Sequence, residues 1–249
     1  MSQRSERAAR EPVFNLPPVI IATLAVLALV HAVRTYLLTS DQDGWVLVTF
    51  AFIPIRITAP QMVGLDWPGG LAGSVWSFVT YAFLHGDWMH YGVNALWLAA
   101  FGTPLARRFG WLRFTLFSLA GAAAGAAAHL LLAPHSVVPL VGASAAISAQ
   151  MAASARFAFS PGARLGGGLA RYDADFRPAL SIMEMVRDRR VVTFLAVWFV
   201  FNLLFGLIFV PPGVETGQIA WESHIGGFLA GLLLFPLFDP VSRRGSSFS

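Results

Sequence analysis

The sequence contains no cysteine, which excludes disulfide bonds, zinc–thiolate sites and thiol nucleophiles. Charged side chains are also scarce, at 12% of 249 residues, whereas 56% of the residues are hydrophobic and the mean hydropathy is +0.64. A soluble domain carries about 25% charged residues. The composition therefore indicates a membrane protein.

Lysine is absent as well, so all 17 basic residues are arginine. These arginines are scattered along the chain rather than gathered with aromatic residues on one surface, as a nucleic-acid interface would require. We therefore expect no nucleic-acid partner, and we relate the basic balance to the lipid bilayer instead.

Apolar segments long enough to cross a bilayer, about 20 residues each, occur six times. The predicted spans are residues 18–38, 88–105, 112–133, 143–160, 191–210 and 222–238. The sequence thus predicts an all-α, polytopic membrane protein with one domain over residues 1–249. It has a short leader (1–16), an inner loop (155–190) and a tail (239–249).

The arginines predict the orientation, because short cytoplasmic loops carry the excess of positive charge. Arginine clusters precede the first span, follow the last, and lie between spans two and three and between four and five. Both termini are therefore expected in the cytoplasm. The leader has no transit-peptide character and contains Glu6 and Glu11, which favours a bacterial plasma membrane.

Two connections are long. Residues 39–87, on the predicted outer side, mix apolar runs with tryptophans and prolines, which is typical of a segment lying in the membrane interface. The inner loop contains three glycines at 166–168, followed by a short amphipathic helix predicted over 178–187.

Polar residues at membrane depth are costly and therefore indicate function. His90 and Asn94 are four residues apart near the start of the second span, Ser144 begins the fourth, and His224 begins the sixth. All three spans enter from the outer side, so the four side chains are expected at similar depth. Gly227 and Gly231 form a GxxxG face that would let another helix come close to the sixth span.

This set of groups has the chemistry of acyl transfer. A serine hydroxyl becomes a nucleophile when an adjacent histidine takes its proton, and amide, imidazole and backbone N–H donors stabilise an oxyanion. Glu222 lies two residues before His224 and would point elsewhere on a helix, so we expect a Ser–His dyad without an acidic partner.

Three motifs in order resemble the rhomboid family of intramembrane serine proteases. They are the histidine, histidine and asparagine series of His85, His90 and Asn94, the serine motif 142–145 (GASA), and His224 with the small residues that follow it. The resemblance covers nearly the whole chain. It implies a six-helix rhomboid-like bundle with an interfacial outer loop between spans one and two.

The resemblance also implies roles for these residues. Ser144 would be the nucleophile and His224 the general base; His90, Asn94 and the Ser144 N–H would form the oxyanion hole. His85 and Gly142 would support the site. The expected substrates are single-span membrane proteins, cut near the outer end of their helices, which would enter beside the aromatic-rich fifth span.

One departure is Ala145, where the common serine motif has glycine. The alternative interpretation is a catalytically inactive rhomboid-like protein that binds and guides membrane clients. Such relatives usually lack the serine or the histidine, and both are present here. A transporter would need internal repeats and polar groups at the bilayer midplane, which the sequence does not suggest.

The sequence lacks the motifs of intramembrane metalloproteases and aspartyl proteases. There is no H-E-x-x-H, and the aspartates nearest the spans, Asp87 and Asp239, fall at opposite faces. We expect no metal and no cofactor. His31 and His129 have no matching polar partner in the pattern, so we expect backbone groups or neighbouring helices to satisfy them.

Overall fold

The computed structural model describes residues 16–64, 66–159, 176–207 and 220–241. This part of the chain is helical and has no strand, only an isolated bridge between Phe52 and Leu140. The helices are α1 (Pro18–Tyr36), α2 (Ser40–Phe50), α3 (Ile55–Thr58), η1 (Pro60–Met62), α4 (Gly70–Thr80), η2 (Tyr81–Phe83), α5 (Trp88–Trp97), η3 (Leu98–Gly102), α6 (Thr103–Leu132), α7 (Ser144–Ala158), α9 (Ile182–Arg187), α10 (Arg189–Leu207) and α11 (Trp221–Phe238).

Three helical segments of the described chain are long and apolar enough to cross a membrane: Pro18–Tyr36, Trp88–Leu132 and Trp221–Phe238. They coincide with the predicted first span, the second and third spans together, and the sixth span. The helix α10 corresponds to the predicted fifth span, 191–210, whose end lies outside the described residues. Most of the leader and most of the tail also lie outside them. The count of six spans stays a prediction.

The segment Trp88–Leu132 is two antiparallel arms rather than one straight rod. Ser154 of α7 donates to the Phe101 carbonyl of the first arm, whereas Ser118 and Gly125 of the second arm lie against Gln150 and Ala145. The end of the first arm therefore lies beside the C-terminal part of α7, whereas the second arm runs back towards the N-terminal end of α7. The turn falls at Gly110, whose φ of 75° is one that glycine adopts without steric cost.

The centre of the bundle is α7, whose residues 145–157 are all buried. It is the predicted fourth span, but its 15 residues extend about 22 Å at the helical rise, less than the hydrocarbon thickness of roughly 30 Å. Helices α6 and α11 and the short π-helix η3 pack around it. Because protein rather than lipid surrounds α7, its length does not have to match the bilayer.

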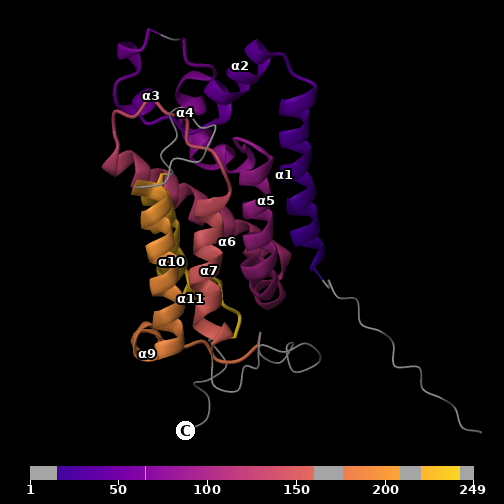
Figure 1. Ribbon diagram of the computed structural model, residues 1–249, viewed down its shortest axis with the longest axis vertical. Coiled ribbons are helices and arrows are strands. Elements are labelled where there is room, and N and C mark those ends of the chain that lie inside the picture. Colours follow the sequence, from indigo (N-terminus) through magenta and orange to yellow (C-terminus); the bar gives the residue numbers. More distant parts are fainter. Residues whose placement is uncertain (1–15, 65, 160–175, 208–219, 242–249) are drawn as a thin grey trace, which may run out of the picture.

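The segment 39–87 is not a loop but a series of short helices, which lie at one end of the bundle (Figure 1). We name this the outer end, after the predicted orientation. Arg56 ties the segment together: its buried guanidinium donates to the carbonyls of Val48, Thr49 and Pro68. Whether the segment lies in the membrane interface stays a prediction.

This outer segment also holds the connection that leads into α7. The amides and carbonyls of Phe52 and Leu140 exchange hydrogen bonds of 3.1 and 2.8 Å. Ile55 donates to the carbonyl of Ser136 at 3.1 Å, and Thr58 donates to that of Pro134 at 2.6 Å. The connection between α6 and α7 is therefore fastened along its length before it reaches Ser144.

The predicted inner loop is shorter than 155–190, because α7 continues to Ala158 and α10 begins at Arg189. The expected helix over 178–187 is wrong in its first residues. The helix α9 begins at Ile182, where Ser181 caps it: Ser181 Oγ accepts from Glu184 N–H, and the Glu184 carboxylate accepts from Ser181 N–H. These hydrogen bonds with Ser181 hold the pKa of Glu184 below its usual value. Residues 160–175, with the three glycines, lie outside the described residues.

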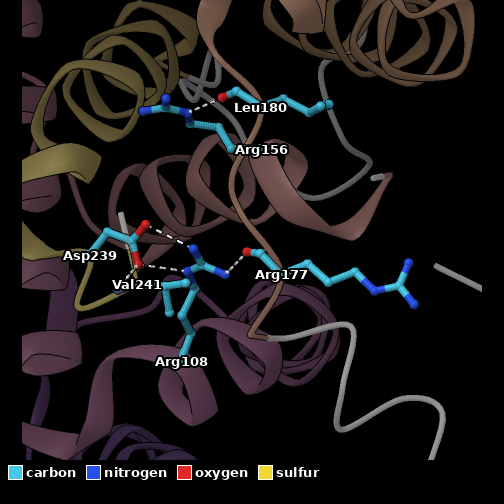
Figure 2. Close-up of polar contacts among 6 residues, drawn as sticks. All are labelled: Arg108, Arg156, Arg177, Leu180, Asp239 and Val241. Carbon is cyan, nitrogen blue, oxygen red and sulfur yellow. Dashed lines mark hydrogen bonds and ion pairs between the residues drawn. The ribbon is translucent and has the colours of Figure 1, made fainter. Parts of the chain in front are cut away.

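A buried ion pair lies where α11 ends, and we name this the inner end of the bundle. Figure 2 shows its contacts. Arg108 donates from Nε and Nη2 to the two carboxylate oxygens of Asp239, both at 2.8 Å, and both side chains are fully buried. Its Nη1 donates to the carbonyl of Arg177 at 2.7 Å, and its guanidinium lies 4.7 Å from the ring centroid of Phe157. The pair thereby joins α6, the end of α11 and the segment that leads to α9.

We expect Arg108→Met to lower the free energy of unfolding by about 3–5 kcal/mol, because it removes a charged partner from the fully buried Asp239 carboxylate. Equilibrium unfolding in detergent micelles measures this change. Arg113→Met, which removes an exposed arginine from the same helix, is the matched control. An unchanged unfolding midpoint for Arg108→Met would contradict the anchoring role.

Candidate active site

Ser144 and His224 are in direct contact. Ser144 is the first residue of α7, and His224 lies in the first turn of α11. The Nε2 atom of His224 and the Oγ atom of Ser144 are 2.8 Å apart. A hydroxyl and an imidazole at this distance form a hydrogen bond, so the pair has the geometry of a nucleophile and its base.

Close packing of helix backbones sets this distance. A Cβ on Gly227 would collide with the carbonyl of Ala145, and a Cβ on Gly231 would collide with that of Ala149. The predicted close approach at the GxxxG face of the sixth span is confirmed. The partner is α7 itself, and the first contact lies one residue after Ser144.

The second GxxxG pair, Gly121 and Gly125, performs the same task from α6. Their missing side chains leave room for the methyl groups of Ala149 and Ala145. A Cβ on Gly125 would also collide with the carbonyl of Ser223, the residue before His224. Three helix backbones therefore meet immediately behind the Ser144–His224 pair.

His90 is held by the residues that begin α5. The Asp87 carboxylate caps the helix by accepting the N–H of His90 at 2.7 Å. The N–H of Gly86 donates to Nδ1 of His90 at 3.4 Å, which assigns the ring proton to Nε2. His90 therefore presents an N–H donor at Nε2.

That donor points at Gly142. A Cβ on Gly142 would lie 2.6 Å from Nε2 of His90 and 3.8 Å from Nδ2 of Asn94. Gly142 also has a φ of 114°, which side chains rarely adopt, and its N–H donates to the carbonyl of Tyr81 at 3.1 Å. The position two residues before Ser144 thus requires glycine for both its conformation and its space.

Three kinds of donor converge near Ser144. Nε2 of His90 and the amide of Asn94 come from α5, and the Asn94 amide also donates to the His90 carbonyl at 2.9 Å. The third is the N–H of Ser144, because the first N–H groups of a helix have no partner within it. The positive end of the helix dipole adds to these donors.

His85 lies behind His90, fully buried, with its ring centroid 5.1 Å from that of His90. Its carbonyl accepts from Arg34, which also binds the Asp43 carboxylate through two nitrogens. His31 is buried too, and its ring packs edge-on against Trp88 at 4.6 Å. The two histidines therefore support the start of α5 through packing.

His129 has a partner that the sequence pattern did not reveal. Its Nδ1 lies 2.9 Å from the Glu222 carboxylate, so a neighbouring helix satisfies it as expected. Two further contacts were not anticipated, the Asp87 cap and the Gly86 donor. An aspartate directly before a helix is a capping signal and could have shown the first.

Within the described ranges, no group of three or more histidine, cysteine, aspartate or glutamate side chains is arranged to hold a metal ion. The polar atoms that do converge are hydrogen-bond donors and one hydroxyl. This arrangement suits a negative charge that develops on an oxygen atom beside Ser144.

Comparison with known proteins identifies the family. The family model of the Rhomboid domain matches residues 72–239, about two thirds of the chain, and the chain belongs to this family. The mouse protein named Rhomboid-related protein 2 is 25% identical over 238 residues, covering 94% of this chain and 70% of its own length. The Arabidopsis thaliana protein named RHOMBOID-like protein 4 is 28% identical over 182 residues, covering 73% of this chain and 39% of its own.

We expect Gly227→Ala to lower the free energy of unfolding by about 1–3 kcal/mol, because the added methyl group forces α11 away from the Ala145 carbonyl. Gly92→Ala makes the same change on α5, where nothing lies within 4 Å, and should be neutral or stabilising. Equilibrium unfolding of both variants in micelles tests the contrast. Equal stability of the two would contradict the close packing of α7 and α11.

Proposed function

We propose that this rhomboid-family protein is an intramembrane serine endopeptidase. Its substrates are single-span membrane proteins, cleaved near the outer end of the transmembrane helix. The observation that carries the proposal is the distance of 2.8 Å between Oγ of Ser144 and Nε2 of His224. Family membership supports the reaction class, and this contact supplies the chemistry within this chain.

In the proposed reaction, His224 takes the proton of Ser144 as the hydroxyl attacks the scissile carbonyl. The tetrahedral intermediate collapses to an acyl-enzyme, and His224 delivers the proton to the leaving amine. Water then attacks the ester, His224 acts again as base, and Ser144 is released. In this scheme the Glu222 carboxylate bonds to His129 rather than to the His224 ring.

The oxyanion of the intermediate would bind beside Gly142. Nε2–H of His90, the amide of Asn94 and the N–H of Ser144 are donors from two helices whose positions are fixed before the substrate arrives. Donors held in this way stabilise developing charge without reorganisation during the reaction. Gly142 leaves the space in which that oxygen atom fits.

Ala145 does not block the site, because its methyl group points away from the chemistry. The side chain is fully buried and lies opposite Gly125 of α6. The extra carbon relative to glycine is thus accommodated on the far side of α7. This supports an active protease rather than the inactive client-binding alternative.

A substrate helix would approach laterally, between α5 and α10. On that side the contact between α10 and the α5–η3 arm is made by aromatic rings, with the centroids of Phe101 and Phe194 5.6 Å apart. Trp198 of α10 stacks on Phe228 of α11 at 5.1 Å. Aromatic rings can separate without leaving hydrogen bonds unmade.

We also propose that the protein lies in a bacterial plasma membrane, with both termini cytoplasmic.

We expect purified protein in liposomes to cleave a single-span reporter, and Ser144→Ala and His224→Ala each to lower kcat at least about 10³-fold, because the attacking hydroxyl or its base is lost. Ser154→Ala and His135→Ala are the matched controls. Ser154 is a buried serine at the far end of α7, and His135 is exposed. Cleavage that persists in Ser144→Ala would contradict the proposal. Client binding by an uncleaving wild type and by Ser144→Ala alike would favour the inactive alternative.

The donors beside Gly142 predict a different kinetic pattern. His90→Ala and Asn94→Ala are each expected to lower kcat by about 10²-fold with little change in KM, because the oxyanion forms only in the transition state. Steady-state kinetics on the same reporter separates the two parameters. A rise in KM at constant kcat would assign these residues to substrate binding instead.

A further inference from the structure

The first turn of α11 is joined to α6 by a hydrogen bond between a histidine and a carboxylate, and this bond takes no part in the proposed chemistry. His129 lies in the last turn of α6 and Glu222 in the first turn of α11, with Nδ1 and Oε1 2.9 Å apart. The side chains are 8% and 13% exposed. We call this pair the α6–α11 latch.

Glu222 occupies the helix end that favours its charge, because a carboxylate is stabilised at the N-terminus of a helix. The two ends meet because α6 and α11 run antiparallel here, with Gly226 against Ala124 and Ala128. Little exposure reduces competition from water, so this hydrogen bond is stronger than a surface pair of the same length.

Side-chain capping contributes little at the start of α11. The residue before it, Ala220, provides no side-chain cap, and the Ser223 hydroxyl bonds back to the Ala220 carbonyl within the same turn. From this turn, Glu222 bonds to α6 and His224 bonds to α7.

These two bonds act on opposite sides of the helix. Residues two apart on an α-helix are separated by about 200° around its axis. Glu222 therefore faces α6 while His224 faces Ser144, and the two bonds together fix the rotation of the turn. The Ser144 bond breaks in every cycle of the proposed reaction, and the Glu222 bond then still restrains the rotation of the turn, beside the backbone contacts of Gly226 and Gly227.

We propose that Glu222 and His129 are positioning residues, which keep the His224 ring aimed at Ser144 while the proton is transferred. This inference rests on the proposed function. The latch touches neither the substrate nor the reacting atoms. Its loss would misalign the base without removing it.

The test compares His129→Leu with His129→Asn in the full-length protein in liposomes. Asparagine keeps an N–H donor close to the place of Nδ1, and leucine has none. We expect His129→Leu to lower both kcat for the reporter and the rate constant for labelling of Ser144 by a fluorophosphonate probe by about 10-fold, with KM unchanged. His129→Asn should recover most of this loss. His135→Leu, the same change at an exposed histidine, should have no effect.

The rate constant separates positioning from folding. A purely structural role would lower the fraction of protein that the probe labels but leave the rate constant of the folded fraction unchanged, and that result would overturn the inference. If His129→Leu does not fold, Glu222→Gln decides: it keeps the shape and weakens the bond, so the rate constant should fall about 3-fold. An unchanged rate constant there would likewise overturn the inference.

The outcomes for the two proposals differ. A wild-type protein that neither cuts the reporter nor reacts with the probe would overturn the proposed function, and this inference with it. A wild-type protein that reacts at the same rate as His129→Leu would overturn the latch alone.

Discussion

The close contact of three helix backbones, α6, α7 and α11, is the constraint on which the site depends. Lipid supplies little hydrophobic drive for helices to associate, so close packing and hydrogen bonds must hold them together. Glycines on α6 and α11 meet alanines on α7 at Ala145 and Ala149. Since the first of these contacts is next to Ser144 and three residues after His224, backbone atoms rather than flexible side chains set the separation of the two reactive groups.

Polar contacts at the two ends of the bundle complete this arrangement. At the inner end, the buried pair of Arg108 and Asp239 joins α6 to the end of α11. At the outer end, the bridge between Phe52 and Leu140 and the bond from Gly142 to the Tyr81 carbonyl hold the chain that enters α7. The helices are thus fixed at both ends, and the donors around Gly142 have their positions before any ligand binds.

The sequence predicted those features that depend on local pattern. Hydropathy located the helices, including α1 and α11 to within two residues, and the arrangement of polar residues at span starts brought His90, Asn94, Ser144 and His224 into one list. It missed features set by contacts distant in sequence. Hydropathy predicted the fourth span but not that other helices enclose α7, because a helix buried in protein is as apolar as one buried in lipid. The His129–Glu222 pair joins residues 93 positions apart and leaves no local signal. The inner helix begins late because the Ser181 capping box, not apolar periodicity, decides where it starts.

The enclosure of α7 has a consequence for how the protein relates to its membrane. Helices that face lipid adjust their tilt when bilayer thickness changes, but the residues between Ala145 and Phe157 are covered by other parts of the chain. Ser144 therefore lies at the start of an enclosed helix, whose depth in the bilayer is set by the neighbouring helices and not by hydrophobic matching. Variation in lipid composition reaches Ser144 through the helices packed on α7. Two of these, α6 and α11, carry His224 and the backbone contacts beside it, so the serine and its base shift as one body.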